Sequence, residues 1–189
     1  MKRSVVWVLG VGALIAMSAG DARAQMSMGT FKGYLTGHVG AVAGGDATNE
    51  RITGGLSVSV HERDGMGAEI DFGHTSDLTS GRQLLDLNTY MVSASFVKPH
   101  GAIRPFANVG AGIMQINGCD APCTITARTY DLGLTAGAGA FLVVSEIFGL
   151  RADARYFFSG AEHPDLHRPD NFAYWRLSIG ATFMWSIVP

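Results

Sequence analysis

The sequence has only two cysteines, no cluster of basic residues and little excess charge of either sign. Lysine and arginine number 14 against 16 aspartates and glutamates, which leaves a formal net charge of −2 with histidine neutral. A nucleic-acid-binding surface needs clustered Lys and Arg. Nothing in the composition suggests a nucleic-acid partner, and we expect none.

Long apolar runs are also scarce. After the first 24 residues, the richest apolar stretch (136–144) is interrupted by Gly137 and Gly139 and is followed by Ser145-Glu146. A transmembrane helix needs about 20 apolar residues, so we expect no such helix there. A closed barrel is the other backbone that satisfies its own hydrogen bonds within lipid. Any membrane crossing by this chain therefore requires β-strands.

The N-terminus has the pattern of a secretory signal peptide. Lys2 and Arg3 precede an apolar run over residues 5–17, and Ala22-Arg23-Ala24 has the form of a cleavage site. The apolar run is too short to span a bilayer. We expect residues 1–24 to be removed on export and residues 25–189 to form one barrel domain.

The segment 174–187 alternates between two kinds of side chain. Apolar residues occupy the odd positions from Trp175 to Ile187, and mostly polar or small residues occupy the even ones. Successive side chains of a strand point to opposite faces. Trp175 and Trp185 are ten residues apart, which at about 3.3 Å per residue and a tilt of about 40° spans roughly 25 Å, the height of the apolar band of an outer-membrane barrel. The pattern predicts a strand that faces lipid.

The same two-residue period recurs in seven earlier segments, between clusters of Gly, Pro and Asp. Eight strands form an even number, as a single-chain antiparallel barrel requires. The sequence therefore predicts an all-β fold, an eight-stranded antiparallel up-and-down transmembrane β-barrel. The segments are 34–41, 56–61, 68–73, 89–96, 106–114, 130–142, 150–159 and 174–187.

The connections between these segments alternate in length, and this orients the barrel. Short turns of such barrels face the periplasm and long loops face the outside of the cell. The short connections are 63–65, 99–101 and 145–149, whereas the long polar connections, predicted to be external loops, are 43–53, 75–87, 117–128 and 160–172.

Aromatic residues on the outward face support this orientation. Tyr and Trp prefer the boundary between membrane and water, so they form a girdle at each rim of a barrel. The outer girdle is predicted to contain Tyr90, Tyr130, Tyr156, Phe158 and Trp175, and the inner girdle Phe96 and Trp185.

Cys119 and Cys123 lie close together in the third predicted external loop. In an oxidising compartment such thiols tend to pair, so a disulfide that shapes the loop is expected. A zinc site is the alternative, but two thiolates lack the third and fourth ligands that zinc takes. His163 and His167 in the fourth loop, near Asp165 and Asp170, could form a surface metal site, but loop histidines are commonly just solvated, and we expect no metal and no cofactor.

Charged residues also occur on the inward faces, together with His38 and His61. The interior of an eight-stranded barrel is just wide enough for side chains, so these charges must pair. Inward glycines such as Gly137 leave room for a large neighbour such as Arg155. The favoured interpretation is a structural ion-pair plug, and the alternative is a gated or selective pore. At the centre of the predicted network are Arg151, Asp153 and Arg155. The full network contains Glu69, Asp71, Asp131, Arg151, Asp153, Arg155 and Arg176.

For enzymatic chemistry the sequence offers one candidate, His74-Thr75-Ser76 with Asp86. By parity these polar side chains face outward near the outer leaflet on neighbouring strands. There, serine, histidine and an acid could act as nucleophile, base and orienting group toward lipid. The interpretation we favour at this point is that they are polar residues at strand ends, and that the protein is not an enzyme.

The Gly-rich inward faces and the runs 104–112 (Arg-Pro-Phe-Ala-Asn-Val-Gly-Ala-Gly) and 149–156 (Gly-Leu-Arg-Ala-Asp-Ala-Arg-Tyr) resemble the outer-membrane β-barrel family. Its small members are similar to the membrane domain of outer membrane protein A. The resemblance covers residues 30–187. It implies a monomer in the outer membrane of a Gram-negative bacterium, surrounded by lipid and lipopolysaccharide and folded by the barrel assembly machinery. The implied role is structural, adhesive or porin-like.

Two departures from that family stand out. Trp185 is followed by Ser186-Ile187-Val188-Pro189, where such barrels usually end in an aromatic residue, and a periplasmic domain after the barrel is not expected. The lipid A deacylases are similar barrels with a His-x-Ser pair on a late strand, but the comparable stretch 153–156 has neither residue. We therefore expect a structural or surface-interaction role through the external loops. A narrow pore and a lipid-modifying hydrolase of the deacylase type remain as alternatives.

Overall fold

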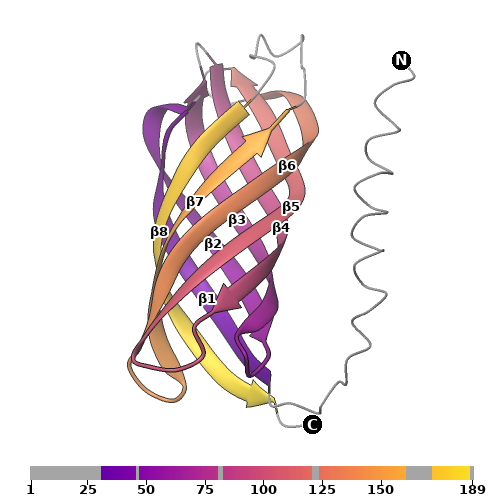
Figure 1. Cartoon of the computed structure of the whole chain (residues 1–189). Helices are drawn as coiled ribbons and strands as arrows, with labels where there is room; N and C mark the ends of the chain where they lie inside the picture. The colour runs from indigo at the N-terminus through magenta and orange to yellow at the C-terminus, as the bar shows by residue number, and fades with distance from the viewer. Residues whose placement is uncertain (1–30, 46, 81–82, 121–123, 161–171, 188–189) are drawn as a thin grey trace, which may run out of the picture. The chain divides into compact units, whose positions relative to one another are not determined.

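The computed structural model describes residues 31–45, 47–80, 83–120, 124–160 and 172–187. The eight strands form one closed barrel in chain order, with every neighbouring pair antiparallel (Figure 1). This confirms the predicted fold class. The predicted signal peptide lies outside the described residues. The strands are β1 Phe31–Gly44, β2 Ala47–His61, β3 Met66–Ser80, β4 Gln83–Val97, β5 Ile103–Asp120, β6 Thr124–Val143, β7 Phe148–Ser159 and β8 Phe172–Ile187.

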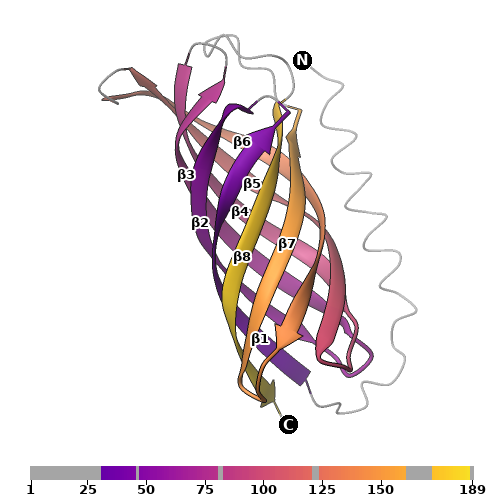
Figure 2. The same cartoon turned by 90° about the vertical axis from the view of Figure 1, so that its left-hand side faces the viewer.

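The barrel is closed by the pairing of its first and last strands. β1 and β8 pair from Phe31 opposite Ile187 to Ala43 opposite Trp175. On its other edge β8 pairs with β7, and the two lie side by side on the near wall in Figure 2. Closure leaves no unpaired strand edge, which satisfies the backbone hydrogen bonds within a membrane.

The outer face of the barrel wall is apolar, as the sequence predicted. On β8, Leu177, Ile179 and Phe183 are 55%, 66% and 51% exposed, whereas Arg176 and Ser178, on the opposite face of the strand, are buried. A barrel that is soluble in water would have the opposite distribution. Among the described residues, no helix is long and apolar enough to cross a membrane.

Tight turns join the strands at one end of the barrel, which we call the tight-turn end. Gly65 and Gly101 have φ values of 95° and 105°, a conformation that glycine adopts without strain. The carboxylate of Asp64 accepts a hydrogen bond of 2.9 Å from the backbone amide of Met66. Because short turns of such barrels face the periplasm, we expect the opposite end, the hairpin end, to face the outside of the cell.

At the hairpin end the structure corrects the predicted loops. Most residues of 43–53, 75–87 and 117–128 continue the strands, because β1, β3 and β5 extend as far as Gly44, Ser80 and Asp120, and β2, β4 and β6 begin at Ala47, Gln83 and Thr124. Pairing reaches Gly44 opposite Ala47, Ser80 opposite Gln83 and Asp120 opposite Thr124. Beyond the lipid, a strand can carry polar side chains on both faces, because both faces meet water while its backbone stays paired. Polar residues there do not mark the end of a strand. Most of the fourth predicted loop lies outside the described residues.

The interior consists of three layers, although the sequence indicated a mostly polar lumen. A middle layer of charged residues lies between two apolar layers. The outer apolar layer, at the hairpin end, contains Val42, Ala47, Leu87, Met91, Met114, Ile116, Phe157, Phe172 and Tyr174. The inner apolar layer, at the tight-turn end, contains Tyr34, Val97, Phe106, Phe141 and Met184.

Candidate functional site

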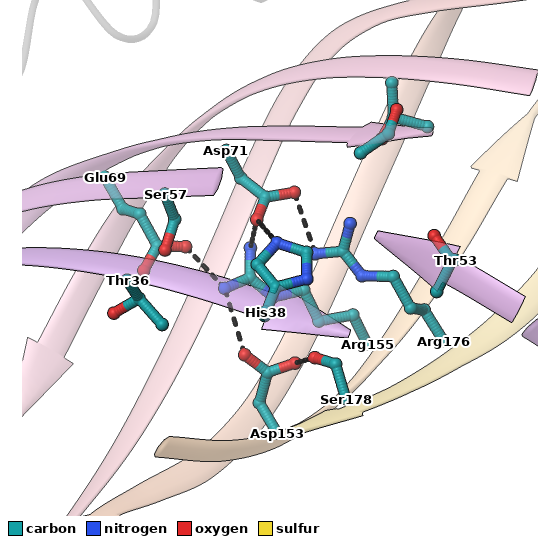
Figure 3. A network of polar contacts seen from close by, with 12 residues as sticks. Thr36, His38, Thr53, Ser57, Glu69, Asp71, Asp153, Arg155, Arg176 and Ser178 are labelled. Atoms are coloured by element: carbon teal, nitrogen blue, oxygen red, sulfur yellow. Dashed lines mark hydrogen bonds and ion pairs between the residues drawn. The ribbon is translucent and has the colours of Figure 1, made fainter. Parts of the chain in front are cut away.

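The middle layer is a network of buried ion pairs, shown in Figure 3. Alternate residues Arg151, Asp153 and Arg155 of β7 all point inward. β3 supplies Glu69 and Asp71 from the opposite wall, since it is four strands from β7 in the ring. The long arginine side chains therefore cross the lumen to reach the carboxylates.

Arg155 connects all three acids of the network. Its Nη2 lies 2.6 Å from Glu69 Oε1 and 3.3 Å from Asp153 Oδ2, and its Nη1 lies 3.5 Å from Asp71 Oδ2. Its side chain is 1% exposed. An arginine at this position acts as a cross-link between the walls of the barrel.

The other two arginines extend the network toward the apolar layers. Arg151 lies 2.7 Å from Glu69 and 2.8 Å from Asp153, and its guanidinium stacks 4.4 Å from the ring centre of Phe106 in the inner layer. Arg176 lies 2.8 Å from Asp71 and stacks 5.0 Å from the ring centre of Phe157 in the outer layer. Cation–π contacts of this kind are stronger when water is excluded.

Charges within the network balance. Three arginines face three carboxylates, and His38 Nε2 lies 3.3 Å from Asp71 Oδ2. The hydroxyl of Ser178 donates a hydrogen bond of 2.8 Å to Asp153. Buried charges are tolerated when they are paired, and each arginine of this layer has at least one carboxylate within ion-pair distance.

The structure thus brings six of the seven predicted network residues together. The seventh, Asp131 on β6, is buried nearer the hairpin end, where it accepts a hydrogen bond of 3.2 Å from Ser159. His61 lies nearer the tight-turn end and contacts Ser95 at 2.7 Å. The contribution of Ser178 and the aromatic stacking were not predicted from the sequence, although inward parity was a signal for both.

One inward glycine gives the arginine its path. A Cβ atom on Gly137 would stand only 2.7 Å from Cγ of Arg155 and 2.9 Å from Oδ1 of Asn108. The stem of Arg155 therefore lies directly over the bare backbone of β6, as the sequence indicated.

The predicted girdle residues all lie on the outer wall. Tyr156 and Trp175 are cross-strand neighbours with ring centres 5.1 Å apart. Trp185 is half-buried because its indole covers Gly33 of β1, where a Cβ atom would overlap the ring. The remaining members, Tyr90, Phe96, Tyr130 and Phe158, also point outward.

Among the described residues, no group of three or more His, Cys, Asp or Glu side chains is arranged to hold a metal ion. His163, His167 and Cys123 lie outside the described residues, so the disulfide between Cys119 and Cys123 stays a prediction.

No family model and no curated protein sequence matches the chain. Several solved structures match it in fold. Neisserial surface protein A matches with a TM-score of 0.64 at 13% identity, over 82% of this chain and 98% of that one. The fold is that of a small outer-membrane β-barrel.

Two further small outer-membrane β-barrels match the chain. Ail, the attachment invasion locus protein of Yersinia pestis, solved with the heparin analogue sucrose octasulfate, has a TM-score of 0.55 at 15% identity, over 83% of this chain and 99% of that one. The N-terminal barrel domain of Pseudomonas aeruginosa OprF has a TM-score of 0.56 at 15% identity, over 83% and 98%. The apolar outer wall agrees with the outer-membrane location that the sequence predicted.

Proposed function

We propose that the protein is a non-conducting outer-membrane barrel that presents its hairpin end at the cell surface for interaction with other molecules. The observation that supports this is the filled lumen. Met91, Met114 and Phe157 in the outer apolar layer are 0% exposed, and Phe141 in the inner layer is 1% exposed. Ion conduction needs a lined, hydrated path. The surface then carries the function, as the ends of rigid scaffolds commonly do.

The charge of the four connections that the sequence predicts to be external loops indicates the chemistry of a partner. Residues 43–53, 75–87, 117–128 and 160–172 contain eight Asp and Glu and four Arg, so their formal charge is 4 − 8 = −4 with histidine neutral. Complementary potentials steer association. We therefore infer a basic partner, in contrast to Ail, whose structure contains a polysulfated ligand.

Planar-bilayer recordings test whether the lumen is closed. The purified barrel should give no steady current, because the two apolar layers exclude a hydrated path. The Phe157→Ala variant should show at most brief steps of current. Arg63→Ala, on the exposed turn, is the matched control. Steady conductance of the unaltered protein would establish the pore alternative instead.

Binding to charged probes tests the surface role. Cells that display the protein should retain a fluorescent lysine oligomer more strongly than cells without it, and 0.5 M salt, which shortens the Debye length to about 4 Å, should remove the difference. A heparin probe should show no such gain. Retention of heparin instead of the lysine oligomer would contradict the proposed partner chemistry.

A further inference from the structure

A second polar cluster lies on the outside of the barrel near the hairpin end. His74 and Ser76 are alternate residues of β3, and both are exposed on the outer wall. Asn88 of β4 stands directly opposite His74 in the strand register. His74 Nε2 lies 2.9 Å from Ser76 Oγ, and His74 Nδ1 lies 2.7 Å from Asn88 Oδ1. Both ring nitrogens are therefore engaged, and Asn88 holds the position beside His74 that the sequence predicted for Asp86.

The direction of these hydrogen bonds follows from the donor and acceptor types. Oδ1 of Asn88 can only accept, so Nδ1 of His74 carries the proton and donates it. Nε2 of the neutral ring is then an acceptor, and the hydroxyl of Ser76 donates to it. A histidine that acts as general base toward a serine needs this tautomer, with a third group holding the far nitrogen.

We propose that Ser76, His74 and Asn88 form a serine-hydrolase triad that cleaves acyl esters of lipids in the outer leaflet. This activity goes beyond the proposed surface interaction and does not depend on it. The support comes from the hydrogen-bond order just described, from the depth of the cluster and from the backbone around Ser76.

The depth of the cluster indicates the substrate. Phe72 lies two residues from His74 on β3, and Tyr90 lies two residues from Asn88 on β4, both on the side toward the lipid. They are 39% and 46% exposed, and their ring centres are 5.2 Å apart. Aromatic rings of this kind mark the boundary between the hydrocarbon and the headgroups. The ester bonds that join acyl chains to a lipid lie at the same boundary, within reach of Ser76.

The pairing of β3 with β4 is irregular beside Ser76. Thr75 pairs with Leu87 but Leu78 pairs with Leu85, so Ser76 and Asp77 together face one residue of β4. This is a β-bulge, which leaves a residue outside the ladder and occurs often beside active sites. A backbone amide released in this way can donate to the oxyanion of an acyl-transfer intermediate.

The wall also leaves room for a substrate. On the β2 side His74 stands opposite Gly54, where the nearest atom to an added Cβ is 3.9 Å away. An acyl chain can therefore lie against bare backbone next to the imidazole.

The reaction has two halves. Ser76 Oγ attacks the ester carbonyl carbon while its proton moves to His74 Nε2. Collapse of the tetrahedral intermediate breaks the ester C–O bond, and His74 returns the proton to the departing alcohol. Water then attacks the acyl-serine, His74 takes its proton and gives it to Ser76 Oγ, and a free fatty acid leaves. Asn88 is a positioning residue, because it orients the ring and touches no reacting atom.

The test uses the mature barrel refolded in detergent, with its folded state checked by heat-dependent migration on a gel. Vesicles of phosphatidylethanolamine and, separately, purified lipopolysaccharide are the probes, and mass spectrometry measures released fatty acid. We expect release from at least one probe, which also identifies the ester. A fluorophosphonate should label the protein at Ser76.

Matched variants separate the triad from its surroundings. Ser76→Ala and His74→Ala should each lower the rate by roughly 1000-fold or more. Gln115→Ala, on the outer wall opposite Asn88, should stay within about twofold. Asn88→Ala should lose activity while Asn88→Asp, which restores an acceptor oxygen, recovers it; a purely structural role would not separate these two.

Two results would overturn the proposal. One is the absence of both fatty-acid release and fluorophosphonate labelling with the folded, unaltered protein. The other is release that persists unchanged in folded Ser76→Ala. Neither result would affect the surface-binding measurements, so failure of this proposal is distinguishable from failure of the proposed function.

Discussion

Removal of the central arginine should strongly destabilise the barrel. In Arg155→Met the network keeps three carboxylates and two arginines, so one negative charge remains uncompensated in a layer that is closed above and below. Arg155 is 1% exposed and contacts Glu69, Asp153 and Asp71 at 2.6, 3.3 and 3.5 Å. Removing one partner of a buried ion pair costs about 3 to 5 kcal/mol. The free energy of unfolding should fall by that amount.

Urea titration of the barrel in detergent micelles, followed by tryptophan fluorescence and by gel migration, measures this loss. Arg63→Met on the exposed tight turn is the control and should stay within about 0.5 kcal/mol of the parent. Adding Glu69→Gln to Arg155→Met restores the charge balance and should recover about 1 to 3 kcal/mol. If Arg155→Met is as stable as the Arg63 control, the buried charges are hydrated and the closed lumen is wrong.

Three further predictions use the same titration. Gly137→Ala should lower the free energy of unfolding by about 1 to 3 kcal/mol, because the new methyl group meets Arg155 at 2.7 Å. Gly37→Ala is the control and should be neutral, because nothing lies within 4 Å of its added methyl group. Equal effects of the two changes would contradict the close approach of Arg155 to Gly137. Leu177→Arg should cost about 2 to 4 kcal/mol if this wall meets lipid, and a neutral result would place it in water. Phe157→Ala should cost about 3 to 5 kcal/mol by opening a cavity in the outer apolar layer, so a neutral result would mean that this layer is loosely packed.

Much of this fold could be predicted from the sequence because the two-residue period repeats in every strand. Parity alone placed Arg151, Asp153 and Arg155 inside and Leu177 outside, since a strand gives each residue only two possible faces. The order of the strands followed from their even number and from the alternating connections. These inferences needed no knowledge of contacts between distant segments.

The features that could not be predicted from the sequence depend on how the strands pair. The extent of the hairpins could not be predicted, because polar residues beyond the lipid suit a loop and a paired strand equally. Asn88 was missed for a related reason. Its place opposite His74 is a matter of register, and the bulge between Thr75 and Leu78 changes the register next to Asp86. The apolar layers were present among the inward residues, but only the closed barrel shows that they gather at two levels.

Quenching of a single tryptophan tests directly whether apolar side chains meet lipid while the lumen is sealed. In a chain of residues 25–189, which lacks Trp7, and with Trp175 and Trp185 replaced, Ile179→Trp places a probe on a wall position that is 66% exposed, and Phe157→Trp places one at a position that is 0% exposed in the outer apolar layer. In vesicles, lipids brominated on their acyl chains should quench the probe at 179. Neither these lipids nor aqueous iodide should quench the probe at 157. Quenching of the 157 probe by iodide, or failure of the brominated lipid at 179, would contradict the account.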